Sequence, residues 1–271
     1  MPAFRLASLF FMLLCLMPYA GALAEPAALR GYDAGQTPHY QYVTFGTYPY
    51  EKDGENAPVL WRVLGRGTPG EGDVINASNV PDTKEPNGDD LTGGMEDVYC
   101  LMTEYIIDFV LYHDVRDEAG GTPLDYADTL IRVYLNEELL GRMFTKSEQA
   151  TLVEMPERGL LSLPSRKGEL FRADYGFVAE DFVALRERRA VGTPYAYALG
   201  LKRIEGNSWY WTTDWRAAGR RWIVGDNGHI SVSGLDRQGG VRPICYVHAD
   251  MLEFLGGDGT LENPYHLGAA Q

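Results

Sequence analysis

The sequence is poor in basic residues, with 24 lysines and arginines against 38 aspartates and glutamates and a formal net charge of −14. Proteins that bind nucleic acids or anionic membrane surfaces draw on clustered basic side chains. The charge balance therefore argues against both as partners. Histidine is also scarce, and His113-Asp114 is the one adjacent histidine–aspartate pair.

The motifs of common catalytic and cofactor-binding sites are absent. The sequence has no glycine-rich phosphate or dinucleotide loop, no His-Glu-x-x-His and no Gly-x-Ser-x-Gly elbow. A zinc site needs about four ligands at known spacings, and no such cluster of cysteine and histidine occurs. We therefore expect no cofactor, no metal and no identifiable catalytic residue. An enzyme of unrecognised type, a hydrolase or an oxidoreductase, stays open as an alternative.

Long hydrophobic runs are absent beyond the first residues. Near the start, Arg5 precedes an apolar run from Leu9 to Met17, and Ala22-Leu23-Ala24 supplies the small residues that signal peptidase recognises. The run is shorter than the roughly 20 residues of a membrane span. These features predict a signal peptide at 1–24, cleavage before Glu25 and no stable membrane span afterwards. We expect an exported protein, periplasmic or secreted.

Cysteine is rare in the mature chain. Of three cysteines, Cys15 lies in the predicted signal peptide, which leaves Cys100 and Cys245. Two cysteines can pair in an oxidising compartment. Both lie in apolar, strand-like segments, where free thiols behave as small buried hydrophobic groups. A disulfide and two buried thiols both remain open, because the sequence fixes no distance between them.

Strand patterns occupy both ends of the mature chain. Aromatic and β-branched residues predict strands in the N-terminal part at 39–45, 59–64 and 98–102. Between the last two, 65–96 is rich in Gly, Asp, Asn and Pro, which predicts a long surface loop. Near the C-terminus, Asp226-Asn227-Gly228 predicts a tight hairpin between strands at 221–224 and 229–233. A further strand is expected over 241–247.

Helix patterns fill the middle of the chain. Thr122-Pro123 predicts a helix start. The apolar positions that follow have the spacing of an amphipathic helix: Ala127, Leu130, Ile131, Tyr134 and Leu135. The capping-box spacing of Thr145 and Glu148 predicts that a second, short helix begins there, and a third is expected over 179–189. Strands, then helices, then strands predict an α+β fold with mostly antiparallel strands. We expect one domain over 25–250 and a C-terminal tail at 251–271.

Several short motifs occur in the order found in a known family. They are Phe45-Gly-Thr-Tyr-Pro49, Leu60-Trp-Arg-Val-Leu64, Ile131-Arg-Val-Tyr-Leu-Asn136, Phe144-Thr145 with Glu148, Thr193-Pro-Tyr-Ala196, Tyr210-Trp-Thr-Thr213 and Gly240-Val-Arg-Pro243. Through them the chain resembles the bacterial extracellular domain-of-unknown-function 6273 family over roughly residues 40–248. That family usually carries an arginine where this chain has Thr212-Thr213, so any role of that arginine is in doubt here.

The last of these motifs are also similar, more faintly, to the C-type-lectin-like fold of the formylglycine-generating enzyme family. There too a tryptophan-rich strand is followed by a glycine turn and a closing strand. This likeness concerns the fold, and a fold does not carry a function. The cysteine pair on which that family's oxidation chemistry depends has no match near these motifs.

Two places in the tryptophan-rich block are candidates for ligand binding. Trp211 and Trp222 are expected in the core, because large aromatic residues dominate core energetics. The first candidate is the charged edge formed by Asp214, Trp215 and Arg216, and the second is the hairpin tip formed by Asp226, Asn227 and His229. Ordinary turn chemistry is the alternative interpretation of the tip.

The resulting hypothesis is a non-enzymatic binding module of the cell envelope with a glycan, peptide or protein ligand. A structural envelope protein with no small ligand is a further alternative. Arg132 and Arg242 are expected to make structural contacts. Asp258 in the tail is a weak candidate for calcium, because its loop lacks the ligand spacing of an EF-hand.

Overall fold

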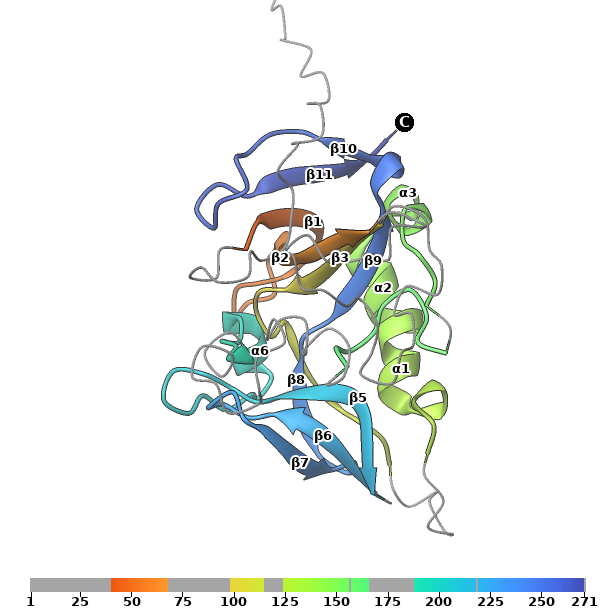
Figure 1. Cartoon of the computed structure of the whole chain (residues 1–271). Helices are drawn as coiled ribbons and strands as arrows, with labels where there is room; N and C mark the ends of the chain where they lie inside the picture. The colour runs from red at the N-terminus through yellow and green to blue at the C-terminus, as the bar shows by residue number, and fades with distance from the viewer. Residues whose placement is uncertain are drawn as a thin grey trace, which may run out of the picture.

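A computed structural model of the chain describes residues 40–67, 98–114, 124–155, 157–165, 188–217 and 219–270. In these residues the fold is α+β, as predicted, with two sheets of mostly antiparallel strands and one main helix (Figure 1). The predicted signal peptide, Thr122-Pro123, and nearly all of the predicted loop at 65–96 and helix at 179–189 lie outside the described residues.

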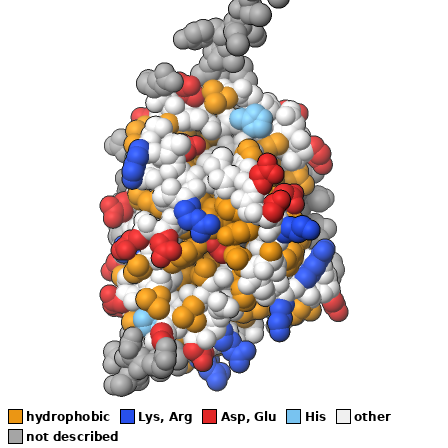
Figure 2. Space-filling view, turned by 180° about the vertical axis from the view of Figure 1, so that it is seen from behind, with side chains coloured by type: hydrophobic (Ala, Val, Ile, Leu, Met, Phe, Trp, Pro, Cys, Tyr) orange, Lys and Arg blue, Asp and Glu red, His pale blue; other side chains and the backbone are white. Residues whose placement is uncertain are grey.

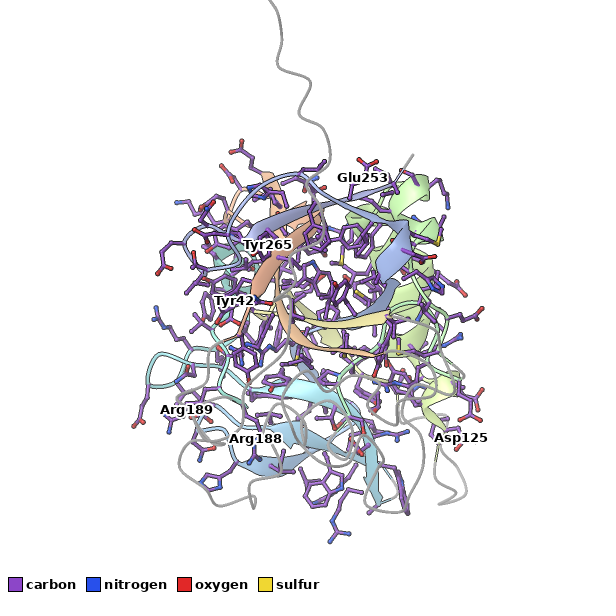
Figure 3. The ribbon with its side chains drawn as sticks, turned by 45° about the horizontal axis from the view of Figure 1, so that its top comes forward. Tyr42, Asp125, Arg188, Arg189, Glu253 and Tyr265 are labelled. Carbon is purple, nitrogen blue, oxygen red and sulfur yellow. The ribbon has the colours of Figure 1, made fainter. Side chains whose placement is uncertain are left out.

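The larger sheet has six strands in the order β10–β11–β1–β2–β3–β9. Its strands are β1 (Tyr42–Pro49), β2 (Asn56–Gly67), β3 (Val98–Thr103), β9 (Ile244–His248), β10 (Leu252–Phe254) and β11 (Tyr265–Ala269). β1 pairs with β11 in parallel, and the other neighbours are antiparallel. Residues from the predicted tail thus extend this sheet, and Figure 3 labels Tyr42 and Tyr265 where β1 meets β11.

The smaller sheet has five strands in the order β4–β8–β5–β6–β7 and lies below the larger sheet in Figure 1. Its strands are β4 (Asp108–Leu111), β5 (Tyr210–Ala217), β6 (Arg220–Val224), β7 (Ile230–Gly234) and β8 (Gln238–Val241). β6 and β7 form the predicted hairpin. Gly228 in its turn has a φ of 86°, a left-handed conformation that glycine adopts without strain.

The prediction of one strand over 241–247 is wrong. β8 ends at Val241 and β9 begins at Ile244, and the two strands belong to different sheets. Pro243 has no N–H and cannot continue a ladder, so the chain changes sheets at this point. Arg242 is fully buried at the crossing, and its Nε donates to the Thr103 carbonyl at 2.8 Å. This contact agrees with the structural role expected of Arg242.

The main helix runs through α1 (Leu130–Val133), the π-helical segment η3 (Tyr134–Leu139) and α2 (Leu140–Met143), after the 3-10 turn η2 (Tyr126–Asp128). Thr129 caps its first turn, because the Thr129 hydroxyl accepts the Arg132 N–H. Ile131 and Leu135 are buried, as the spacing predicted. Leu130 is not: it occupies the first helical position and is 46 % exposed.

Shorter helices complete the fold. α3 (Lys146–Ala150) begins with the predicted capping box between Thr145 and Glu148. α6 (Pro194–Ala198) has Thr193 as its cap and proline in its first turn, and η4 (Ala249–Met251) joins β9 to β10. No helix in the described part of the chain is long and apolar enough to cross a membrane.

The core has two clusters, and β3 and β9 contribute to both. Leu101 and Cys245 lie opposite each other and belong to one cluster, whereas Cys100 and Tyr246 lie opposite each other and belong to the second. Neighbouring residues of a strand point to opposite faces, so the two thiols point apart. Both cysteines are buried, and neither forms a disulfide. The structure thus contains two buried thiols on opposite faces of the sheet, and no disulfide joins Cys100 to Cys245. Burial raises the pKa of the Cys245 thiol.

Candidate functional site

A cavity of about 380 Å³ opens at the tip of the β6–β7 hairpin. It is termed the hairpin hollow. Its apolar lining comes from Trp209, Ile223 and Ile230. Its polar side chains are those of Asp226, Asn227, His229, Ser231, Ser233 and Arg237. All three residues of the second predicted candidate thus line one cavity, together with side chains from β7 and from the residues just before β5 and β8.

The hairpin tip is held by its own hydrogen bonds. The Gly225 N–H donates to the His229 carbonyl at 2.8 Å, and the Gly228 N–H donates to the Gly225 carbonyl at 2.9 Å. The Asn227 Oδ1 accepts the His229 N–H at 3.0 Å, so the predicted turn chemistry is present. Arg189 adds a bond from its Nε to the Asn227 carbonyl at 3.1 Å, and Figure 3 shows Arg189 beside this hairpin. The tip is therefore fixed without a ligand.

Trp209 forms a rigid apolar wall of the hollow. Its ring meets the fully buried Trp211 edge to face, with centroids 4.9 Å apart and an interplanar angle of 82°. A Cβ at Gly239 would lie 2.3 Å from the Trp209 ring and 2.5 Å from the Trp211 Nε1. Glycine in β8 is therefore needed for this packing. Trp209 itself is only partly buried, and an aromatic ring held in this way is a good contact for a sugar ring or an apolar side chain.

Several polar side chains of the hollow have no partner in the described part of the chain. Among those residues, the Asp226 carboxylate, the His229 ring and the Arg237 guanidinium make no hydrogen bond or ion pair, and neither do the hydroxyls of Ser231 and Ser233. One carboxylate, one guanidinium, one imidazole and two hydroxyls thus border the same cavity, and none of them bonds to another group of the described residues. Ligand sites combine an apolar wall with a few such polar groups.

The first predicted candidate lies away from the hollow, at the other end of the β5–β6 ladder. Trp215 pairs with Arg221 there, whereas Tyr210 pairs with Val224 near the hairpin tip. Trp215 is 45 % exposed, as predicted. Asp214 accepts a hydrogen bond from the Ser165 hydroxyl at 3.3 Å. The two candidates therefore do not form one site.

Trp222 differs from its prediction. It is half-buried and does not belong to the core, whereas Trp211 is fully buried as expected. The Arg216 guanidinium lies over the Trp222 ring, 5.3 Å from its centroid. A flexible charged side chain thus covers part of the Trp222 ring, and the rest of the ring stays in contact with solvent.

A second group of polar side chains, the tyrosine–aspartate cluster, lies beside the main helix. Asp108 is buried and accepts hydrogen bonds from the hydroxyls of Tyr48 and Tyr134, and the Phe109 N–H donates to it at 2.7 Å. The Arg142 guanidinium lies 4.8 Å from the centre of the Tyr48 ring. Burial first, and the negative charge of Asp108 second, raise the pKa of both phenols.

Sequence reasoning missed part of both groups. Alternation along β7 could have indicated Ser231 and Ser233, because they share a face with Ile223 across the ladder. Arg237 joins the hollow through the pairing of β8 with β5, which no local pattern signals. Asp108 had no signal either, because its partner Tyr48 lies 60 residues away.

Comparisons of the chain with protein-family models, with curated proteins and with solved structures find no match. The two family resemblances therefore remain predictions, and the C-type-lectin-like fold is not confirmed. Motif residues nevertheless have structural contacts in this fold. The Trp61 Nε1 donates to the Phe45 carbonyl at 2.8 Å, and the Asn136 Oδ1 accepts the Leu160 N–H at 2.8 Å.

Proposed function

We propose that this protein is an exported binding module of the cell envelope and that its ligand binds in the hairpin hollow. The observation that supports it is the presence, in one cavity, of the Trp209 ring with Asp226, His229 and Arg237, whose side chains have no partner in the described part of the chain. The proposal of export rests on the predicted signal peptide.

The size and rigidity of the hollow support this function. Its volume of about 380 Å³ falls near the lower end of ligand pockets, which span roughly 300–1,000 Å³. This is enough for one sugar residue or a few amino-acid side chains. The tip is held by hydrogen bonds from Gly225, Gly228 and Arg189. A preformed site loses less conformational entropy when it binds, which favours affinity.

The chemistry of the lining suits a polar ligand with one apolar face. Ser231 and Ser233 can donate to or accept from ligand hydroxyls and amides. Arg237 can pair with an anionic group, and Asp226 can accept hydrogen bonds from a donor. The Trp209 ring offers the surface on which an apolar face of the ligand would pack.

The test is a binding screen of the chain, without its predicted signal peptide, against glycan, peptidoglycan and peptide arrays. Each ligand found is then titrated against two hollow variants, Trp209→Ala and Arg237→Ala, which we expect to weaken binding about tenfold or more. Arg237 is exposed, so its variant should fold normally even if Trp209→Ala does not.

Trp215→Ala is the matched control for this test. It also removes a partly exposed tryptophan of the same block, but from outside the hollow, so we expect less than about a twofold change in affinity. A lack of binding to all three arrays would contradict the proposed function. Equal losses of affinity in Trp215→Ala and Arg237→Ala would also contradict it, because they would show that binding does not depend on the hollow.

A further inference from the structure

β7 is an edge strand of the smaller sheet, and among the described residues only β6 pairs with it (Figure 1). Two hydrogen bonds show which of its backbone groups point outward. The Gly225 N–H donates to the His229 carbonyl at one end of the strand, and the Leu235 N–H donates to the Gly219 carbonyl at the other end. Along an antiparallel strand, residues alternate: the N–H and C=O of one residue bond to the neighbouring strand, and those of the next residue point away from it. The backbone groups of Ser231 and Ser233 therefore face β6.

Ile230, Val232 and Gly234 consequently direct their N–H and C=O groups away from β6. These groups make no hydrogen bond within the described part of the chain. Edge strands are usually protected by lysine, by proline or by a bulge. The segment Ile-Ser-Val-Ser-Gly has no charged residue and no proline, and its pairing with β6 has no register shift. β7 thus offers an unprotected edge directly beside the hollow.

We propose that the ligand of the hairpin hollow is an extended, acidic peptide segment that adds to β7 as a further strand. This inference rests on the proposed function, because the same hollow would receive the side chains of the peptide. Alternate side chains of an added strand point to one face. Those on the face of Ser231 and Ser233 would enter the hollow and reach Trp209 and Arg237. Backbone bonds then supply affinity and the hollow supplies specificity.

The charges around β7 favour an acidic peptide. Three arginines flank this edge: Arg189 is bonded to the hairpin tip, Arg220 lies opposite the last residue of β7, and Arg237 lines the hollow. Two aspartates, Asp226 and Asp236, lie nearby. Among these five described side chains, three positive charges stand against two negative ones, in a chain with a net charge of −14. Figure 2 shows basic side chains in the lower part of the molecule, where the smaller sheet lies, together with acidic ones.

A second copy of this chain suits the edge less well than a peptide of another protein. Pairing of β7 with itself would bring the same arginines together, and it would also bring together two chains that each carry a net charge of −14. Repulsion between like charges opposes both contacts. The opposite charge of an acidic peptide would instead speed its association with the edge.

The probes are three libraries of capped octapeptides in which every second residue is glutamate, lysine or serine and the other positions vary. Affinities are measured by calorimetry, and amide hydrogen exchange is followed residue by residue by NMR. We expect the glutamate library to yield ligands about tenfold tighter than either other library. Bound peptide should slow the exchange of Ile230, Val232 and Gly234. Equal affinities across the libraries, or no slowing at β7, would overturn the proposal.

Val232→Pro tests the strand addition itself. Proline removes one outward N–H and leaves the bonds to β6 in place, so binding of the best glutamate peptide should fall about tenfold or more. Val232→Ala is the control, because it keeps the N–H, and its affinity should stay within about twofold. Spectra of β6 amides verify that the hairpin is folded in both variants. Equal affinities of the two variants would overturn strand addition.

Two outcomes separate this inference from the proposed function. If a glycan binds in a way that depends on Arg237 while no octapeptide binds, the peptide proposal fails and the proposed function stands. If neither glycans nor peptides bind, both fail.

Discussion

The tyrosine–aspartate cluster and the hairpin hollow each gather polar side chains around an aspartate, and they differ in how those side chains are satisfied. In the cluster, buried Asp108 accepts hydrogen bonds from Tyr48 and Tyr134. In the hollow, the side chains of Asp226 and Arg237 have no partner in the described part of the chain and border an open cavity.

This difference separates groups that hold the fold from groups that can serve a ligand. A buried polar group without a partner costs about 1–3 kcal/mol, because it has lost water and gained nothing. A group at an open cavity keeps its water and can exchange it for a ligand at little cost. Substitutions in the cluster should therefore act on stability, and substitutions in the hollow should act on binding.

The largest effect is expected for Asp108→Ala. This change leaves the hydroxyls of Tyr48 and Tyr134 without their acceptor, and we expect a loss of about 3 kcal/mol in the free energy of unfolding. Urea unfolding followed by circular dichroism measures it. The control Asp226→Ala should change stability by less than about 0.5 kcal/mol. Similar losses in the two variants would remove the distinction between cluster and hollow.

Gly239→Ala should combine both kinds of effect. The new Cβ would lie 2.3 Å from the Trp209 ring, and such overpacking costs about 1–3 kcal/mol. The ring must shift, so ligand binding should fall as well. The control is Gly141→Ala, since nothing lies within 4 Å of a Cβ at this position in α2. Alanine there should stabilise the helix by up to about 1 kcal/mol. If Gly239→Ala were as stable as the wild type, the Trp209 wall of the hollow would have to move aside without cost, which would contradict its rigidity.

Alkaline pH should weaken the cluster. The raised phenol pKa values of Tyr48 and Tyr134 mean that the folded chain keeps these protons at a pH where the unfolded chain releases them. Stability from this source is complete below the unfolded value of about 10 and declines as the pH rises above it. Unfolding midpoints between pH 8 and pH 11 measure the decline, and Tyr134→Phe should make it shallower. A midpoint that stays constant above pH 10 would contradict the burial of these phenols.

The sequence predicted the elements whose signals are local. The capping box of Thr145 and Glu148 and the hairpin around Asn227-Gly228 both depend on residues within one turn, and both are present. The passage of the chain between sheets at Pro243 depends on which strands pair, and a continuous apolar run conceals it.

Long-range pairing also explains why only half of the candidate site could be predicted. Asp226, Asn227 and His229 were found because a turn brings its own residues together. Trp209 faces them because β5 pairs with both β6 and β8. Trp215 has more polar neighbours in the sequence than Trp209. The pairing of β5 with β6 nevertheless places Trp215 at the end of the ladder opposite the hollow.

The smallest effect is expected for Arg216→Ala. This variant tests whether the end of the ladder opposite the hollow contributes to stability or to ligand binding. The Arg216 side chain is exposed and lies over Trp222, and exposed cation–π contacts contribute about 0.5–1 kcal/mol. A double-mutant cycle with Trp222→Leu isolates this contribution. Ligand affinity should not change, in contrast to Arg237→Ala, which removes the same charge from the hollow. A loss of affinity in Arg216→Ala would mean that the ligand extends along the whole hairpin, because no contact joins Arg216 to the hollow within the described residues.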